Sequence, residues 1–136
     1  NNADVRTALN IPTSAPGFNL CQKSVDEGGK FDYHSQPEAS KWIYTILKNK
    51  IKILFYSGDT DGALPTHGTR QWINSLHWKK TNETRQWYID NQVAGFAESW
   101  DGMDLVTVHG TGHMAPGWKP KQVTTMILAW IYGEEF

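Results

Sequence analysis

The sequence predicts an α/β fold, in which helices pack against a sheet that contains parallel strands. Short runs of β-branched and aromatic residues alternate with segments whose apolar residues recur every three or four positions, which is the pattern of strands and amphipathic helices in such folds. Two of the strand-like runs lead directly into turns that carry acidic residues or histidines. Open α/β sheets place their functional sites beyond strand ends of this kind. At 136 residues and 39% hydrophobic content, the chain is expected to form one domain.

Composition excludes several classes of partner. The formal net charge is -1 and the basic residues are scattered, so we expect neither a nucleic-acid partner nor an acidic membrane surface. No apolar run approaches the roughly 20 residues that span a bilayer. The first ten residues, NNADVRTALN, lack the basic and then apolar layout of a signal peptide, so we expect any targeting segment to be absent or removed.

The first third of the chain predicts two helices around a long irregular segment. Asp4 to Leu9 forms a short helix with one apolar face, and Pro12 ends it. The chain up to Ser35 is rich in Pro, Gly, Ser and Asn without periodicity, which indicates irregular structure. A capping box then opens the second helix with the letters SQPE. The apolar stripe of that helix consists of Ala39, Trp42, Ile43, Ile46 and Leu47.

The middle of the chain predicts a buried strand, a turn with two carboxylates and a helix. Ile51 to Tyr56 is a continuous apolar run bounded by Gly58, which is typical of a strand buried on both faces of a parallel sheet. The strand delivers Asp59 and Asp61 onto a turn flanked by glycines. Pro65 and Thr66 then open a helix whose buried face is formed by Trp72, Ile73 and Leu76.

The last part of the chain predicts a hairpin, a second buried strand and a final helix. After a polar linker, Lys79 to Thr84, the runs Arg85 to Asp90 and Val93 to Trp100 form a hairpin around Asn91-Gln92. Leu105 to His109 is the second short strand, and a glycine-rich loop leads from it to His113. The final helix runs from about Pro120 to Tyr132, and Gly133 stops it. Its inner face carries Val123, Met126, Ile127 and Trp130.

Asp61 and His113 are the candidate catalytic residues. The carboxyl ends of two parallel strands meet at one edge of a sheet, so we expect these side chains to lie side by side. A carboxylate beside a histidine fixes the tautomer and stabilises the imidazolium that forms when the histidine takes a proton from a nucleophile. The acid precedes the histidine by 52 residues, by subtraction of their numbers, which agrees with the Ser, Asp, His order of α/β hydrolases.

Other interpretations of these residues remain open. The letters DTDG from Asp59 resemble the start of a calcium loop, but the third acidic position and the terminal glutamate are absent. His109 and His113 are four residues apart, yet glycines between them exclude a helix and no H-E-x-x-H pattern exists. We therefore expect no metal and no cofactor. The remaining alternative is a loop histidine with satisfied hydrogen bonds beside an aspartate that stabilises its turn.

Nearly the whole chain resembles the C-terminal part of a serine carboxypeptidase. The motifs that carry the resemblance are N-N-x-D-V-R-x-A-L from Asn1, Y-S-G-D-T-D-x-x-x-P from Tyr56, V-A-G-F from Val93 and G-x-G-H-M-x-P from Gly110, followed by K-P at Lys119. The resemblance implies that residues 1–136 are the C-terminal portion of one α/β-hydrolase domain that removes C-terminal residues from peptides. It also implies that Asp61 is the triad acid and His113 the base, with Asp59 as a neighbour. Because Asp59 directly follows Gly58 at the strand end, we expect its side chain to accept backbone hydrogens and shape the turn.

The resemblance also suggests a role for Met114 and a cellular location. Met114 is expected to line the pocket for the departing C-terminal residue, and plain packing beneath the loop is the alternative. The family resemblance implies a glycoprotein of the secretory pathway that is lysosomal, vacuolar or extracellular. Asn82 starts the glycosylation sequon N-E-T and is expected to lie on an exposed linker.

The nucleophile that the resemblance demands is missing from this sequence. None of the seven serines has glycine two positions before and two after it, so no G-x-S-x-G elbow is present. We therefore expect a larger companion chain with that serine, or a chain that is a fragment of a longer enzyme. The single cysteine, Cys21, is expected to be joined to the companion chain by a disulfide, with a free thiol as the alternative. An acyltransferase, a hydroxynitrile lyase and a non-catalytic homologue remain alternative functions.

Overall fold

The computed structural model describes residues 1–19 and 40–136. The chain divides into two units, Asn1–Ala39 and Ser40–Phe136. None of the helices within the described ranges is long and apolar enough to cross a membrane.

The first unit contains a short capped helix, as predicted. Helix α1 (Ala3–Ala8) begins after Asn2, whose side chain accepts hydrogen bonds from two backbone amides of the first turn. The guanidinium of Arg6 donates to the backbone carbonyls of Pro12, Ala15 and Pro16. These bonds fold the segment after the helix back onto α1. The capping box that starts at Ser35 and most of the predicted irregular segment lie outside the described residues.

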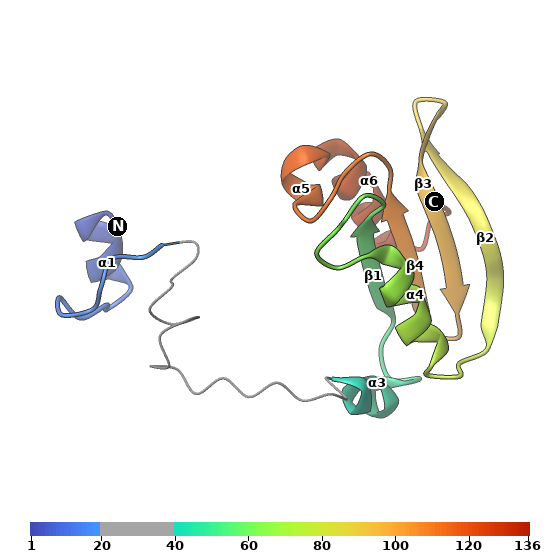
Figure 1. Cartoon of the computed structure of the whole chain (residues 1–136), viewed down its shortest axis with the longest axis horizontal. Coiled ribbons are helices and arrows are strands. Elements are labelled where there is room, and N and C mark those ends of the chain that lie inside the picture. Colours follow the sequence, from blue (N-terminus) through green and yellow to red (C-terminus); the bar gives the residue numbers. More distant parts are fainter. Residues whose placement is uncertain (20–39) are drawn as a thin grey trace. The chain divides into compact units, whose positions relative to one another are not determined.

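The second unit is built on a four-stranded sheet with the order β1-β4-β3-β2 (Figure 1). Strands β1 and β4 are parallel, whereas β3 is antiparallel to both β4 and β2. The predicted α/β class is therefore confirmed, and the sheet is mixed. In chain order, the elements of this unit are α3 (Lys41–Leu47), β1 (Ile53–Gly58), α4 (Thr66–Asn74), β2 (Lys80–Ile89), β3 (Gln92–Trp100), β4 (Met103–Val108), α5 (Ala115–Trp118) and α6 (Pro120–Tyr132).

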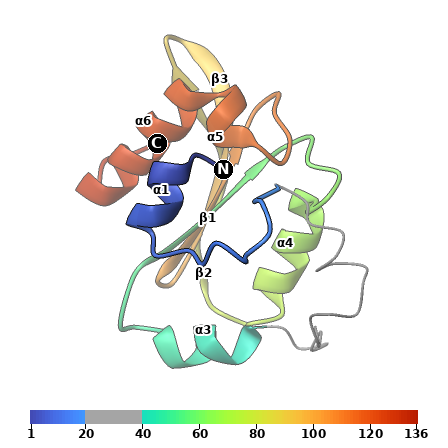
Figure 2. The ribbon, with the colours of Figure 1, turned by 90° about the vertical axis from the view of Figure 1, so that its left-hand side faces the viewer.

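Helices cover both faces of this sheet, because α4 and α6 lie on opposite sides of the strands (Figure 2). Alternate residues of β4 point to the two faces: Met103 and Leu105 pack on the side of α4, and Val106 and Val108 on the side of α6. The apolar cluster on the α6 side has as its buried members Trp87, Ala94, Ala97, Val106, Val108, Ala115, Val123 and Met126. Of the predicted inner face of the final helix, Val123 and Met126 are buried and Ile127 packs against the cluster, whereas Trp130 lines a polar pocket. Helix α6 has the predicted bounds.

The hairpin of β2 and β3 is longer than the sequence suggested. Pairing with β3 extends back to Lys80, which lies opposite Trp100, so the predicted polar linker is in fact strand. The turn residues are Asp90 and Asn91, both with positive φ, one position earlier than expected. Gly95 leaves room for the indole of Trp87, whose Nε1 donates to the Thr107 carbonyl at 2.9 Å. Any Cβ at Gly95 would lie 1.8 Å from that same oxygen.

The predicted burial of strand β1 on both faces is wrong. Strand β1 is not covered on both faces, since Tyr56 is 41% exposed and β4 is its one pairing partner among the described residues. In α3 the expected apolar stripe is largely open, with Trp42 60% and Ile46 52% exposed. An apolar stripe or run shows which side chains form a face but not whether something covers that face.

Candidate active site

The site lies where the two parallel strands end together. Gly58, the last residue of β1, is in register with Val108, the last residue of β4. Beyond the strands the pairing continues, since the Asp59 amide donates to the Val108 carbonyl and the Thr60 amide to the Thr111 carbonyl, both at 3.1 Å. The turn after β1 and the loop after β4 are therefore held against each other. We call residues 59–64 the acid turn and residues 109–114 the histidine loop.

Gly58 makes this close approach possible. A Cβ at position 58 would lie 2.2 Å from the carbonyl oxygen of Thr111 and 2.4 Å from that of Gly112. No side chain fits at such distances, so any other residue would push the acid turn and the histidine loop apart.

Asp61 contacts both its own turn and His113. Its Oδ1 accepts hydrogen bonds from the amides of Ala63 at 2.8 Å and Leu64 at 3.0 Å. Its Oδ2 lies 3.0 Å from Nδ1 of His113. The predicted proximity of Asp61 and His113 is therefore confirmed. Only 7% of the Asp61 side chain is exposed, whereas the imidazole of His113 is 55% exposed.

These contacts favour the ionised form of Asp61. The hydrogen bond from the Leu64 amide lowers the pKa of the Asp61 carboxyl below its usual 3.8, because the amide dipole stabilises the carboxylate. The hydrogen bond to His113 and the Ala63 amide lower this pKa further, and partial desolvation opposes them. Asp61 is thus a negatively charged carboxylate at the pH values at which a protonated His113 would need a negative partner.

Asp59 makes a second carboxylate–histidine contact, with His109. Its Oδ2 lies 2.6 Å from Nδ1 of His109, and its Oδ1 accepts the Gly110 amide hydrogen at 2.8 Å. Asp59 accepts a backbone hydrogen as expected, but from the histidine loop, whereas Asp61 caps the amides of the acid turn. The expectation that Asp59 shapes its own turn is therefore wrong. Sequence reasoning missed this role of His109. Strand register could have predicted it, since Gly58 opposite Val108 places Asp59 opposite His109.

Met114 and Trp118 flank His113 on its C-terminal side. Met114 is 57% exposed, so its side chain is not packed beneath the histidine loop. Trp118 is 63% exposed and belongs to α5, a helix that the sequence analysis did not predict. A Cβ on Gly112 would lie 3.2 Å from the Trp118 ring, so this ring covers the loop backbone next to His113. The site thus has exposed apolar side chains beside its imidazole.

The remaining predicted residues lie elsewhere or outside the described ranges. Asn82 is exposed, but it lies in β2 opposite Ser99, between two irregularities in the pairing, and not on a linker. Whether it carries a glycan stays a prediction. Cys21 lies outside the described residues. Within residues 1–19 and 40–136, no three His, Cys, Asp or Glu side chains are grouped so that they could hold a metal ion.

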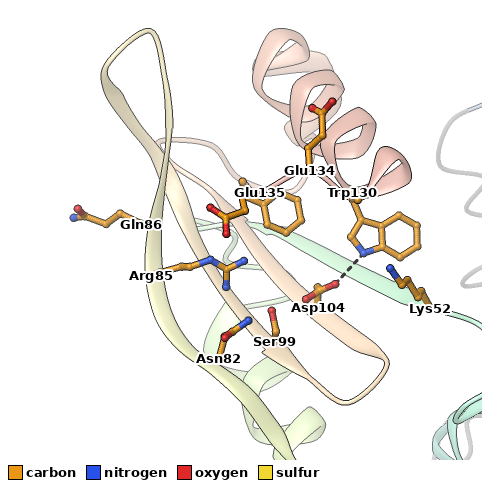
Figure 3. A pocket seen from close by; sticks show the side chains of 11 residues that line it. Lys52, Asn82, Arg85, Gln86, Ser99, Asp104, Trp130, Glu134 and Glu135 are labelled. Carbon is orange, nitrogen blue, oxygen red and sulfur yellow. Dashed lines mark hydrogen bonds between the residues drawn. The ribbon is translucent and has the colours of Figure 1, made fainter.

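A polar pocket of about 490 Å³ lies at the opposite end of the sheet (Figure 3). Its lining includes Asp104 at the start of β4, whose carboxylate accepts the indole hydrogen of Trp130 at 2.9 Å. Arg85 also lines it, and Nη1 of that side chain is buried without a hydrogen-bond partner in the described part of the chain. Cationic and acidic side chains are mixed there, and neither Asp61 nor His113 belongs to this pocket.

Comparison with known proteins gives one consistent family. A family model described as serine carboxypeptidase matches residues 1–133. The lysosomal protective protein of Mus musculus is 33% identical over 141 residues, which cover all of this chain and 29% of the mouse protein. The serine carboxypeptidase ctsa-4.1 of Caenorhabditis elegans is 34% identical over 147 residues, which cover all of this chain and 30% of the nematode protein.

A plant relative shows the same partial coverage. The putative serine carboxypeptidase-like 30 of Arabidopsis thaliana is 32% identical over 143 residues, covering 98% of this chain and 27% of the plant protein. The chain therefore spans less than a third of the length of these relatives.

Proposed function

Because this chain belongs to the serine carboxypeptidase family, we propose that it supplies the acid and the histidine of a Ser-His-Asp triad. The reaction is hydrolysis of the C-terminal peptide bond of a peptide substrate. The observation that carries the proposal is the contact between Asp61 Oδ2 and His113 Nδ1 at 3.0 Å. This contact occupies Nδ1 of His113 and leaves Nε2 of the half-exposed imidazole available to the nucleophile. A triad requires this arrangement.

The proposed mechanism is acyl transfer through a covalent ester. A serine Oγ attacks the carbonyl carbon of the last peptide bond while Nε2 of His113 takes the hydroxyl proton. When the tetrahedral intermediate collapses, the C–N bond breaks and His113 returns the proton to the departing amine. Water then attacks the ester with His113 again acting as base, which releases the shortened peptide and restores the serine. Asp61 holds the tautomer and stabilises the imidazolium in both steps.

We infer that the serine comes from a part of the enzyme beyond this sequence, in a larger companion chain cut from the same precursor. The absence of G-x-S-x-G from the sequence and the limited coverage of the relatives support this inference. Cys21 would join the two chains by a disulfide. One edge of β1 pairs with no strand of residues 1–19 or 40–136, and the apolar face of α3 is open. The companion would cover both surfaces.

The companion can be tested by expressing this chain alone. Its open strand edge and apolar helix face should make the isolated chain aggregate or unfold without cooperativity. Light scattering and urea unfolding followed by circular dichroism report these properties. A soluble monomer with a cooperative transition would contradict the two-chain model, and a free Cys21 thiol in the native protein would contradict the disulfide.

Further roles follow from the same proposal. Met114, exposed beside His113, would line the pocket for the departing residue. A glycan on Asn82 and a lysosomal, vacuolar or extracellular location would follow from maturation in the secretory pathway. The name of the mouse relative supports a lysosomal location.

The activity is tested on matched peptides with the assembled enzyme, meaning this chain together with the companion. A blocked dipeptide with a free C-terminal carboxylate should release its last amino acid, whereas the same dipeptide with a C-terminal amide should react far more slowly. Free amino acid is measured over time, with and without an added alcohol as acyl acceptor. Equal cleavage of both peptides, or ester formation without hydrolysis, would contradict a carboxypeptidase.

A further inference from the structure

The second carboxylate–histidine pair, Asp59 with His109, has no part in the mechanism above. We propose that this pair positions the histidine loop and thereby sets the orientation of His113. This inference rests on the proposed function, because the role of the pair is defined relative to the base. Asp59 and His109 are positioning residues, not members of the triad.

One carboxylate holds two consecutive residues at the start of the histidine loop. Asp59 Oδ1 accepts the Gly110 amide hydrogen at 2.8 Å, and Oδ2 contacts His109 Nδ1 at 2.6 Å. Asp59 is itself fixed, since its own amide donates to the Val108 carbonyl at 3.1 Å. The carboxylate is therefore an anchored link between the end of β1 and the loop that leads to His113.

Packing does not hold the loop at this point. No atom outside the neighbouring residues would lie within 4 Å of a Cβ on Gly110, and the φ of Gly110 is 69°. Glycine in this region of φ and ψ is conformationally free, so Gly110 is the position where the loop could rotate most easily. The hydrogen bond from its amide to Asp59 restrains that rotation. Farther along, the contact of Thr60 with Thr111 and the cover of Trp118 over Gly112 restrain the backbone instead.

The surroundings of His109 fit a positioning role better than a chemical one. Its side chain is 64% exposed and that of Asp59 is 26% exposed. No hydrogen bond found in the described part of the chain joins His109 to Asp61 or His113. His109 therefore cannot pass a proton to the triad directly. Its contact with Asp59 is the second contact between that carboxylate and the histidine loop.

Three variants separate the contacts of this pair. Asp59→Ala removes the contacts with His109 and with the Gly110 amide, whereas His109→Ala removes only the first. Asp59→Asn keeps an oxygen for the Gly110 amide but loses the negative charge. The matched control is Asp90→Asn, which removes the same charge from the exposed ion pair with Lys121 in the hairpin turn. The double variant of Asp59→Ala with His109→Ala tests whether the two residues act through one contact.

Two measurements on the assembled enzyme report the outcome. Hydrogen exchange followed by mass spectrometry on a peptide that spans residues 109–113 should speed up in Asp59→Ala and, less strongly, in His109→Ala, but not in the control. Turnover on the blocked dipeptide should fall about tenfold to hundredfold in Asp59→Ala with KM within about twofold of wild type, because misplacing a reacting group by about 1 Å costs rate at that scale. The double variant should match Asp59→Ala alone.

The results distinguish this inference from the proposed function. If exchange in residues 109–113 stays at the wild-type rate in both alanine variants, the inference is wrong whatever the activity. If exchange rises while kcat is unchanged, the pair holds the loop without positioning the base, and the inference is again wrong. If the wild-type enzyme cleaves no peptide at all, the proposed function fails, and exchange alone then decides whether the pair holds the loop. Should Asp59→Ala fail to fold, the exposed His109→Ala substitution is measured instead. The same criteria for exchange in residues 109–113 and for kcat then apply.

Discussion

The two carboxylate–histidine pairs use the same residue types at the same edge of the sheet, yet their surroundings differ. Asp61 is 7% exposed and turns its second oxygen back to the amides of its own turn. Asp59 is 26% exposed and turns its second oxygen to the Gly110 amide of the opposite loop. Both carboxylates contact a histidine, at 3.0 Å and 2.6 Å, so the partner of the other oxygen is what distinguishes them.

Replacing each histidine by alanine should give the largest difference in turnover between the two carboxylate–histidine pairs. His113→Ala removes the proposed base, so turnover should fall on the order of 10⁶-fold, as it does when the base of a serine protease triad is removed. His109→Ala removes one of the two contacts that Asp59 makes with the histidine loop, so it should cost less than Asp59→Ala, about tenfold or less. Both are measured as kcat on the blocked dipeptide with the assembled enzyme. Similar losses in the two variants would end the distinction between base and positioning residue.

Gly58→Ala should break both pairs together. The added Cβ would meet the Thr111 carbonyl at 2.2 Å and separate the acid turn from the histidine loop, at a cost of about 1–3 kcal/mol in the free energy of unfolding. The matched control is Gly62→Ala in the same turn, because a Cβ there meets nothing within 4 Å. Urea unfolding measures the difference between the two variants. Equal stability would mean that the close approach at Gly58 is not needed.

Sequence reasoning located the elements that have strong local signals. The bounds of α6 were predicted from its apolar periodicity and from Gly133, which has φ 71° and stops the helix. The predicted strand ends, close to the observed ends at Gly58 and Val108, placed Asp61 near His113 because parallel strands share an edge. These predictions depend on a few neighbouring residues, which is why they succeeded.

What failed depends on partners distant in the sequence. Lys80 to Thr84 looks like a polar linker, but it pairs with β3 and becomes strand because the hairpin continues. The stripe of α3 is periodic, but periodicity could not show that Trp42 and Ile46 lie open. The contact of Asp59 with His109 followed from strand register, which the sequence does not display. Contacts between distant parts of the chain, or their absence in the described residues, decided each of these outcomes.

Asp61 should make the stability of the protein depend on pH. The pKa of Asp61 is lower in the folded protein than its usual 3.8. A depressed pKa contributes stability that is complete above the ordinary value and is lost as pH falls through the folded value. Between about pH 5 and pH 3, wild type should therefore lose more stability than Asp61→Asn. Urea midpoints across this range measure the effect, with Asp90→Asn as control, and parallel curves for wild type and Asp61→Asn would contradict it.

The central claim is that Asp61 orients the base His113, whereas Asp59 holds the histidine loop in place. Each carboxylate has its Oδ1 committed to backbone amides, so an asparagine at either position keeps its oxygen there and turns its NH₂ group toward the histidine. At position 61 that amide would force His113 into the tautomer with the proton on Nε2, which cannot accept the serine proton. At position 59 the same change alters only His109, which transfers no proton in the proposed mechanism.

The most direct measurement compares kcat of Asp61→Asn and Asp59→Asn in the assembled enzyme on the blocked dipeptide. Asp61→Asn should lower turnover by about 10⁴-fold, the loss known for the same change in a Ser-His-Asp triad. Asp59→Asn should lower it less than about tenfold, since one hydrogen bond is weakened and about 1 kcal/mol is at stake. A large loss in Asp59→Asn together with a small loss in Asp61→Asn would contradict the assignment of the two aspartates.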